Sequence, residues 1–365
     1  VTKLCLNDFL EEAVSPWSLI SFFAIATFHV SLIHYYTKDI AIAAESPIIR
    51  ATEQFSRFFS FSGFTIIFLT SILTAFSGTH IIKRIRLFGF LCLGWCVFSG
   101  LMSGVSQYFL VWDIYPLIFL GVFICSVVER KSTKALYGLG LIGFTMLWIP
   151  FWSYSEYFSM PVDLKIVLGF ADCDLDVSEW PIFPWIGLVW VGYSLGHGIR
   201  SLSTEEKNNY FVFSRKEAAI WAVFLLAGST QFGAFFNINL GSFFACEAYR
   251  QPPVIWWGHF IYVLFAVRAS LIPKVQEWLG QQRIIRWISQ LAISRKFWLA
   301  YITNYLFAHV IDWMLNITQV ELTGWNVPVI AFIAVFFLPM TEIVTRLIIS
   351  FFSNLIVLKN KFSKN

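Results

Sequence analysis

Residues 182–199 read IFPWIGLVWVGYSLGHGI, and this stretch decides the fold that we expect. Its one side chain that can ionise near neutral pH is His197, which stands close to the end of the run. A helix needs about 20 mostly apolar residues to cross the hydrocarbon core of a bilayer. The stretch therefore predicts a membrane-spanning helix that ends beside the charged connection following it.

The rest of the chain has the same character. Of its 365 residues, 58% are hydrophobic and 19% aromatic, and only 13% are charged. Soluble domains carry about 25% charged residues. This small number of charges cannot cover the surface of a water-soluble protein of this length. The composition therefore argues against a soluble enzyme, a disordered chain and a small disulfide-stapled protein. No clustered basic face of the kind that nucleic acid requires is visible either.

Ten stretches have the length and hydropathy of a spanning helix. They are roughly 13–35, 55–77, 85–103, 110–128, 134–153, 182–199, 217–238, 253–273, 297–318 and 327–352. None alternates apolar and polar residues as the strand of a membrane barrel would. We therefore predict an all-α, polytopic integral membrane bundle of about ten transmembrane helices, forming a single domain over residues 1–365.

The connections between these spans indicate their orientation. With the N-terminus inside, 19 of the 26 Lys and Arg residues fall in inside segments and five in outside segments. Because cytoplasmic connections are enriched in cations, this asymmetry places both termini in the cytoplasm. The stretch 275–296 mixes Trp, Ile and Leu with Arg, which suits an interfacial helix on the inner leaflet and an ordinary cytoplasmic connection equally well.

Cysteines give a limited prediction. Cys173 and Cys246 both fall in outside segments, where oxidation can occur, so a disulfide between them is one reading. The six cysteines form no CxxC pair and no Cys/His ligand set, and we expect no metal.

Ionisable side chains inside a membrane are costly, so each one is a functional hypothesis. Five of them, from four different spans, fall in the outer half of the predicted bilayer: His29, Asp113, His259, His309 and Asp312. A buried His can take a proton from a hydroxyl or amine, and a carboxylate can fix its tautomer. Proton-transfer chemistry among these five residues is therefore one reading. Hydrogen bonds between neighbouring helices account for the same residues without any chemistry.

A second group lies on the predicted inner side. It consists of Lys83, Arg84, Arg86, Lys131, His197 and Arg200. Lys and Arg are natural partners of phosphate, so these residues can form a cytosolic mouth for an anionic ligand. The cations among them also have an ordinary role as determinants of topology.

Several blocks resemble the transmembrane acyltransferase superfamily, specifically its heparan-α-glucosaminide N-acetyltransferase-like branch. They are RIRLFGFLCLG from Arg84, VWDIYPLIFLG from Val111, FPWIGLVWVGYSLGHG from Phe183 and PPVIWWGHFIYVLF from Pro252, with a weaker LAYITN from Leu299. The blocks stand in the expected order along the chain, and the one from Phe183 is the most specific.

This resemblance implies a membrane enzyme that moves an acetyl group from cytosolic acetyl-CoA to a hydroxyl or amine across the membrane. His29 matches the histidine that the family uses, so we expect catalysis by His29 and Asp113. The acceptor-side polar cluster would consist of His259, His309 and Asp312.

The chain also departs from the family's pattern. Ser15 and Ser18 stand where a charged Asp and Arg are common. His197 stands where the family often has Arg, and Asn304 where it often has His.

From these observations we expect a multi-pass acyltransferase of a bacterial cytoplasmic (inner) membrane. Its partners would be membrane lipids and an extracytoplasmic glycan or lipid-linked acceptor, and we expect no nucleic acid. The sequence also allows assembly into a homo-oligomer. Two alternatives remain. One is a proton-coupled transporter or flippase that uses the His/Asp cluster as a relay. The other is a catalytically inactive membrane subunit that keeps the acyltransferase fold.

Overall fold

The computed structural model describes residues 62–77, 81–103, 114–170, 181–202, 214–236, 272–291 and 339–351, together with 261, 264, 265, 268, 269, 303, 307, 310, 314, 317, 318 and 354. Within these residues every regular element is helical and no strand occurs, which confirms the all-α prediction. The chain divides into two compact units, Phe64–Pro273 and the remainder, Val1–Gly63 with Lys274–Asn365. That the two units belong to one membrane domain stays a prediction.

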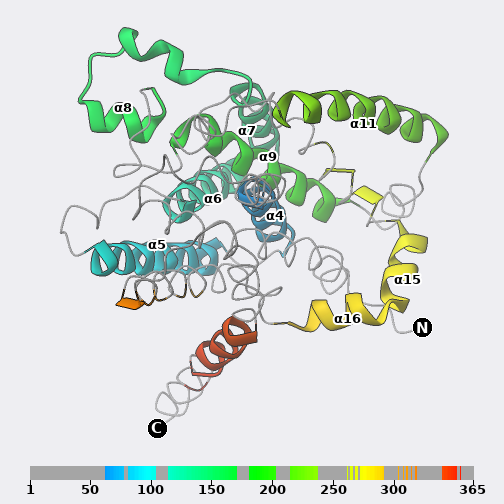
Figure 1. Ribbon diagram of the computed structural model, residues 1–365. Coiled ribbons are helices and arrows are strands. Elements are labelled where there is room, and N and C mark those ends of the chain that lie inside the picture. The colour runs from blue at the N-terminus through cyan, green and yellow to red at the C-terminus, as the bar shows by residue number, and fades with distance from the viewer. Residues whose placement is uncertain are drawn as a thin grey trace. The chain divides into compact units, whose positions relative to one another are not determined.

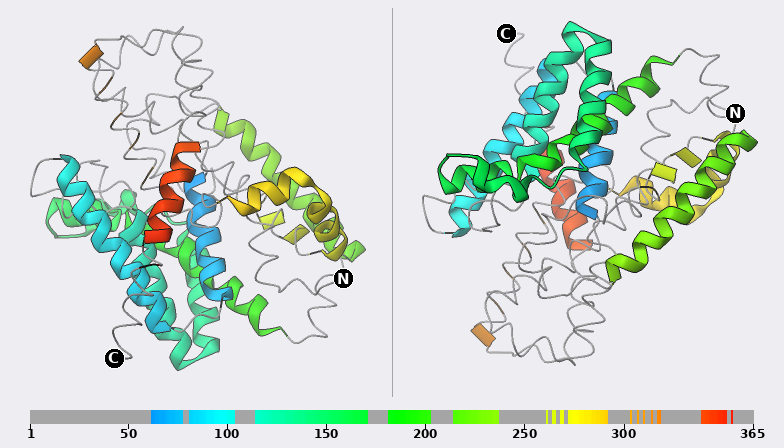
Figure 2. Two further views of the ribbon diagram at one scale, coloured as in Figure 1. Left: turned by 90° about the horizontal axis from the view of Figure 1, so that it is seen from below. Right: turned by 90° about the horizontal axis from the view of Figure 1, so that it is seen from above.

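The longer described helices of the unit Phe64–Pro273 overlap the predicted apolar stretches. The described helices of this unit are α4 (Ser62–Phe76), α5 (Ile81–Ser103), α6 (Ile114–Lys131), α7 (Thr133–Met146), the 3-10 helix η2 (Phe151–Tyr157), α8 (Val162–Leu168), α9 (Ile182–Ser201) and α11 (Arg215–Phe236) (Figure 1). The expected range 182–199 differs from α9 by two residues at its end. The right view of Figure 2 shows α11 as one uninterrupted helix.

The largest difference from the predicted ranges is at the end of α7. The span expected over 134–153 ends as an α-helix at Met146, and the chain continues through a turn into η2. The reason is Pro150, which has no backbone N–H and disfavours a helical conformation in the residue before it. The segment expected as a plain outside connection also contains a short helix, α8, which ends at Leu168 and is followed by a capping glycine, Gly169, with φ +89°.

Aromatic rings gather where η2 and α8 meet the start of α9. The ring centroid of Phe170 lies 4.2 Å from that of Phe158, 5.7 Å from that of Phe151 and 5.8 Å from that of Phe183. This cluster closes the end of the unit at which α7 ends and α9 begins.

Helix α9 is the central helix of this unit, and glycines let α4 approach one of its faces. A Cβ added at Gly192 would lie 2.7 Å from the carbonyl oxygen of Phe68, and one at Gly196 would collide with the backbone of Ile72. Small residues four apart permit such close helix packing. Larger side chains at these positions would push α4 away.

A different face of α9 meets α7 in the same manner. A Cβ at Gly143 would lie 2.7 Å from the carbonyl oxygen of Gly187, and one at Gly140 would lie 2.6 Å from Oγ of Ser194. The Ser194 hydroxyl donates to the carbonyl oxygen of Leu136 at 3.0 Å. Backbone contacts and a buried hydrogen bond therefore fix α7 on α9.

The distribution of polar and apolar side chains in this unit is unusual for a protein in water. Large apolar residues are exposed along the outer faces of α5, α7 and α11, among them Phe90, Leu93, Leu141, Val223 and Leu226. Side chains in the interior include Ser71, Ser126, Ser194 and His197. Polar side chains are therefore found between the helices of this unit, while several large apolar side chains lie on its surface.

Among the described helices, only α9 is both long enough and apolar enough to cross a membrane, and most of it is buried inside the unit. The core helix of a soluble protein can have the same length and hydropathy. A shorter apolar helix covers Ile67–Phe76. The number of membrane spans therefore stays a prediction.

The other unit contains α15 (Pro273–Gln281), α16 (Arg283–Gln290) and a helical stretch over residues 339–351. In that stretch Nε of Arg346 donates to Oε1 of Glu342 at 2.5 Å, one helical turn away. This pair matches the i,i+4 spacing that favours contact on one helix face.

Candidate functional site

The last two turns of α9 carry three polar side chains on one face. Tyr193, His197 and Arg200 are four and three residues apart, which places them in a row along the helix. The row faces the last turn of α6, where Glu129 precedes Arg130 and Lys131. We call Glu129, Tyr193, His197 and Arg200 the Glu129 cluster.

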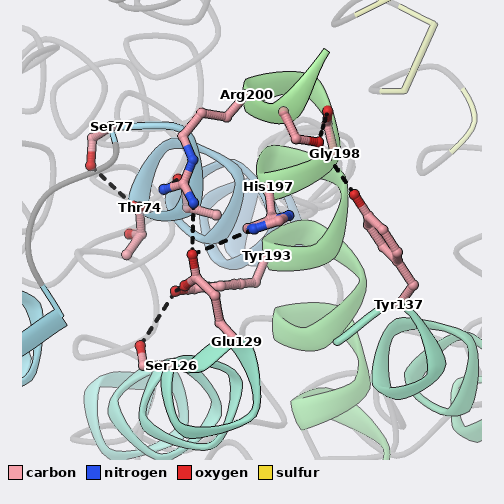
Figure 3. A network of polar contacts seen from close by, with 11 residues as sticks. Thr74, Ser77, Ser126, Glu129, Tyr137, Tyr193, His197, Gly198 and Arg200 are labelled. Carbon is pink, nitrogen blue, oxygen red and sulfur yellow. Dashed lines mark hydrogen bonds and ion pairs between the residues drawn. The ribbon is translucent and has the colours of Figure 1, made fainter. Parts of the chain in front are cut away.

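Three side chains of α9 converge on the carboxylate of Glu129 (Figure 3). Nη2 of Arg200 donates to Oε1 at 2.7 Å, and the hydroxyl of Tyr193 donates to Oε2 at 2.5 Å. Nε2 of His197 lies 3.6 Å from Oε1. The side chain of Glu129 is 12% exposed and that of His197 9%, whereas that of Arg200 is 32% exposed. The cluster is therefore buried at its carboxylate and partly open at its guanidinium.

The cluster joins α4, α6 and α9. Nη1 of Arg200 donates to the carbonyl oxygen of Ala75 at 2.9 Å, in the last turn of α4. A cation is favourable there because the last carbonyls of a helix carry partial negative charge. On the α6 side, Oγ of Ser126 lies 3.4 Å from the hydroxyl oxygen of Tyr193.

A side chain of α7 covers the imidazole. The ring of Tyr137 lies 6.0 Å from that of His197 in an edge-to-face arrangement, and its hydroxyl oxygen lies 3.5 Å from Oγ of Ser201. Four helices thus contribute to the surroundings of His197 and Arg200.

Exposed cations gather at this end of the unit. Helices α4, α6 and α9 end here and α7 begins here, because Ser132 joins α6 to α7 and caps α7 by accepting from the N–H of Ala135 at 3.3 Å. Helix α5 runs antiparallel to α6, since Gly89 faces Phe119 and Trp95 packs on Tyr115. Its first turns therefore point towards the same end. The exposed cations are Lys83, Arg86, Arg130, Lys131 and Lys134.

The arrangement suits an anionic ligand better than a metal ion. Within the described ranges, no three His, Cys, Asp or Glu side chains lie together in a way that could hold a metal. Guanidinium and ammonium groups form strong, charge-assisted hydrogen bonds with phosphate and carboxylate. Since Glu129 already balances the charge of Arg200, the exposed cations are the groups with positive charge to offer.

The structure brings together some of the predicted site residues. His197 and Arg200 lie in the Glu129 cluster, and Lys131 is two residues after Glu129 on α6. Lys83 and Arg86 are exposed in the first turns of α5, and the side chain of Arg84 lies outside the described part of the chain. Also outside it are His29, Asp113, His259, His309, Asp312, Cys173 and Cys246.

Glu129 was not predicted from the sequence. It stands in a run of cations, and the rule used for orientation counts only Lys and Arg. The signal that points to it is on α9, where three polar residues share a face and therefore need an acidic partner from another helix.

A second carboxylate–arginine site lies in the same unit. Arg268 donates to Glu217 through Nε at 2.5 Å and through Nη2 at 2.9 Å, so one arginine uses both carboxylate oxygens. Nε1 of Trp221 lies 3.4 Å from Oε1 of Glu217, and the Trp221 ring packs on Phe265 at 5.6 Å. We call Glu217 and Arg268 the Glu217 pair; it attaches the start of α11 to a later helical segment.

Comparison with known proteins adds no identification, because no family model, curated protein or solved structure matches the chain. The resemblance to the acyltransferase branch therefore rests on the sequence blocks from Arg84 to Asn304.

Proposed function

We propose that this chain is a membrane-embedded acyltransferase that moves an acetyl group from cytosolic acetyl-CoA to a hydroxyl or amine of an extracytoplasmic glycan or lipid-linked acceptor. The observation that carries the proposal is the Glu129 cluster, in which one carboxylate orients an arginine, a histidine and a tyrosine. Exposed cations of α5, α6 and α7 lie at the same end. A phosphate-rich donor such as coenzyme A requires a positively charged entrance of this kind.

The membrane setting is part of the proposal. Large apolar side chains are exposed on α5, α7 and α11, while serine and histidine are buried between helices. Lipid accommodates such a surface, and it makes hydrogen bonds between helices necessary for buried polar groups. We propose a multi-pass bundle of about ten spans in a bacterial cytoplasmic membrane, with the Glu129 cluster on the cytosolic side.

The residues at the entrance have different tasks in this proposal. Lys83, Arg86 and Lys131 are exposed and contact the phosphates of the donor. Arg200 and His197 are held by Glu129, so they act as positioning residues. They keep their contacts with Glu129 when an anion binds beside them. The 32% exposure of the Arg200 side chain leaves it accessible from outside the cluster.

The transfer step is assigned to residues of the outer half. The acceptor oxygen or nitrogen bonds to the thioester carbonyl carbon, and the carbon–sulfur bond breaks. His29 takes the proton of the acceptor and returns it to the coenzyme A thiolate, while Asp113 orients His29. Such a base contributes about 10²–10⁴-fold, so positioning of donor and acceptor supplies the rest. His259, His309 and Asp312 are assigned to acceptor binding.

The donor site is tested by equilibrium dialysis of labelled acetyl-CoA against the purified full chain in detergent. The triple variant Lys83→Gln/Arg86→Gln/Lys131→Gln is expected to bind the donor at least about tenfold more weakly than the wild type. The control is Arg215→Gln/Lys216→Gln, which removes exposed cations from the start of α11 and should bind normally. A folded wild type that binds no acetyl-CoA contradicts the proposal.

The transfer itself is tested in vesicles loaded with a membrane extract as acceptor source. His29→Ala should keep donor binding and lose transfer of the labelled acetyl group. Donor binding without any transfer by the wild type points to the inactive-subunit alternative. Proton-coupled flux without donor binding points to the transporter alternative.

A further inference from the structure

Helices α15 and α16 repeat one sequence pattern. Residues 273–281 read PKVQEWLGQ and residues 282–290 read QRIIRWISQ, so an offset of nine aligns Lys274 with Arg283, Trp278 with Trp287 and Gln281 with Gln290. In the structure the two copies are separate helices, and Gln282 lies between them. Each copy therefore forms one short helix with a cation in its first turn and a tryptophan one turn later.

The repeated residues are exposed in both copies. Trp278 is 58% exposed and Trp287 is 59% exposed, although large aromatic rings are usually well buried. Lys274 and Arg283, each four residues before a tryptophan, are exposed as well. Each helix thus presents an indole and a cation side by side on one face.

The charge of this surface is positive. Among the described residues of the two helices, three exposed residues are basic, namely Lys274, Arg283 and Arg286, and one is acidic, Glu277. Indole rings favour the headgroup level of a bilayer, where an apolar ring and a polar N–H are both accommodated. Cations beside them attract anionic headgroups.

We propose that α15 and α16 form a binding surface for anionic phospholipid headgroups, with Lys274 and Arg283 on the phosphates and Trp278 and Trp287 inserted at the headgroup level. Two copies of the same indole–cation pair, set nine residues apart, provide two contacts of the same chemistry for headgroups. This surface shares no residue with the Glu129 cluster, and the proposal does not depend on the chain being an acyltransferase.

The test uses the full chain, purified in a neutral detergent and titrated with phosphatidylglycerol or with phosphatidylcholine, and bound lipid is counted by native mass spectrometry. The wild type should retain phosphatidylglycerol in preference to phosphatidylcholine. Lys274→Gln/Arg283→Gln should bind phosphatidylglycerol about tenfold more weakly. The matched control Arg215→Gln/Lys216→Gln also removes two exposed cations from a helix start, and it should bind as the wild type does.

A second variant examines the indoles. Trp278→Ser/Trp287→Ser keeps all the charges, and it should weaken retention of phosphatidylglycerol while acetyl-CoA binding stays unchanged. Equal retention of the two lipids by the wild type overturns the proposal. So does a loss in the Arg215/Lys216 control as large as that in Lys274→Gln/Arg283→Gln. Because the substituted side chains are exposed, circular dichroism should show unchanged helix content in each variant.

Discussion

The Glu129 cluster and the Glu217 pair both join helical segments through a carboxylate and an arginine, but they do so differently. In the Glu217 pair one arginine occupies both carboxylate oxygens, and its own side chain is 8% exposed. In the Glu129 cluster three side chains share the carboxylate, and Arg200 also reaches the end of α4. The Glu217 pair is a closed structural contact, whereas the Glu129 cluster holds several polar groups beside exposed cations. The two sites thus share an ion pair. The number of polar side chains and their accessibility distinguish a binding site from a purely structural contact.

The largest effect on stability is expected at the Glu217 pair. Glu217→Gln leaves the nearly buried guanidinium of Arg268 without this counter-charge, and breaking a buried ion pair in this way costs about 3–5 kcal/mol. Thermal unfolding of the purified protein in detergent measures the loss. The fraction that remains folded should bind acetyl-CoA with the dissociation constant of the wild type. Weaker donor binding by this folded fraction would remove the distinction between the two sites.

Glu129→Gln should have a smaller effect on stability and a larger one on the ligand. Arg200 is about a third exposed, so water compensates part of the lost charge, and we expect a loss of about 1–3 kcal/mol. Because His197 and Arg200 lose their common acceptor, acetyl-CoA binding should weaken about tenfold, which equals about 1.4 kcal/mol. Thermal unfolding and equilibrium dialysis on the same preparation separate the two effects. A normal dissociation constant would reduce the cluster to a second structural contact.

Tyr193→Phe separates the hydrogen bond from the packing of the ring. The ring is fully buried and stays in place, while the bond from the hydroxyl to Oε2 of Glu129 is lost. We expect a loss of about 1.5 kcal/mol in unfolding free energy and a change in donor binding smaller than that of Glu129→Gln. Denaturant titration in detergent provides the first value. An effect on donor binding larger than that of Glu129→Gln would mean that the hydroxyl, not the carboxylate, organises the site.

The smallest effect is expected at Glu342 and Arg346, within one helix of the other unit. The Arg346 side chain is 60% exposed, so Glu342→Gln should cost about 0.3–0.5 kcal/mol. The same unfolding assay applies, and this variant sets the scale for an exposed pair. A loss as large as that of Glu217→Gln would show that exposure does not explain the differences between these pairs.

Much of the described helical structure could be predicted from hydropathy, because long apolar runs such as 182–199 have few alternatives to a helix. The end of α7 differs, since the apolar run continues past the helix and only the proline at position 150 stops it. The close contact of Gly192 and Gly196 with α4 depends on tertiary packing, which one sequence does not reveal.

The candidate site was predicted in part. His197 and Arg200 are recognisable as polar residues at the end of an apolar run, and the structure places them in one cluster. Glu129 is 71 residues away from Arg200 in the chain, and nothing in its local sequence distinguishes it from a surface residue of a charged connection. Long-range pairing of this kind follows from how α6 and α9 pack, which is set by glycines such as Gly121 against Val189.

The most direct test of the account is the dissociation constant of acetyl-CoA for the wild type, Glu129→Gln and Glu217→Gln, measured by equilibrium dialysis at a temperature where all three are folded. The account predicts binding by the wild type, equal binding by Glu217→Gln and about tenfold weaker binding by Glu129→Gln. Equal dissociation constants for the two variants, or no binding by the wild type, would contradict it.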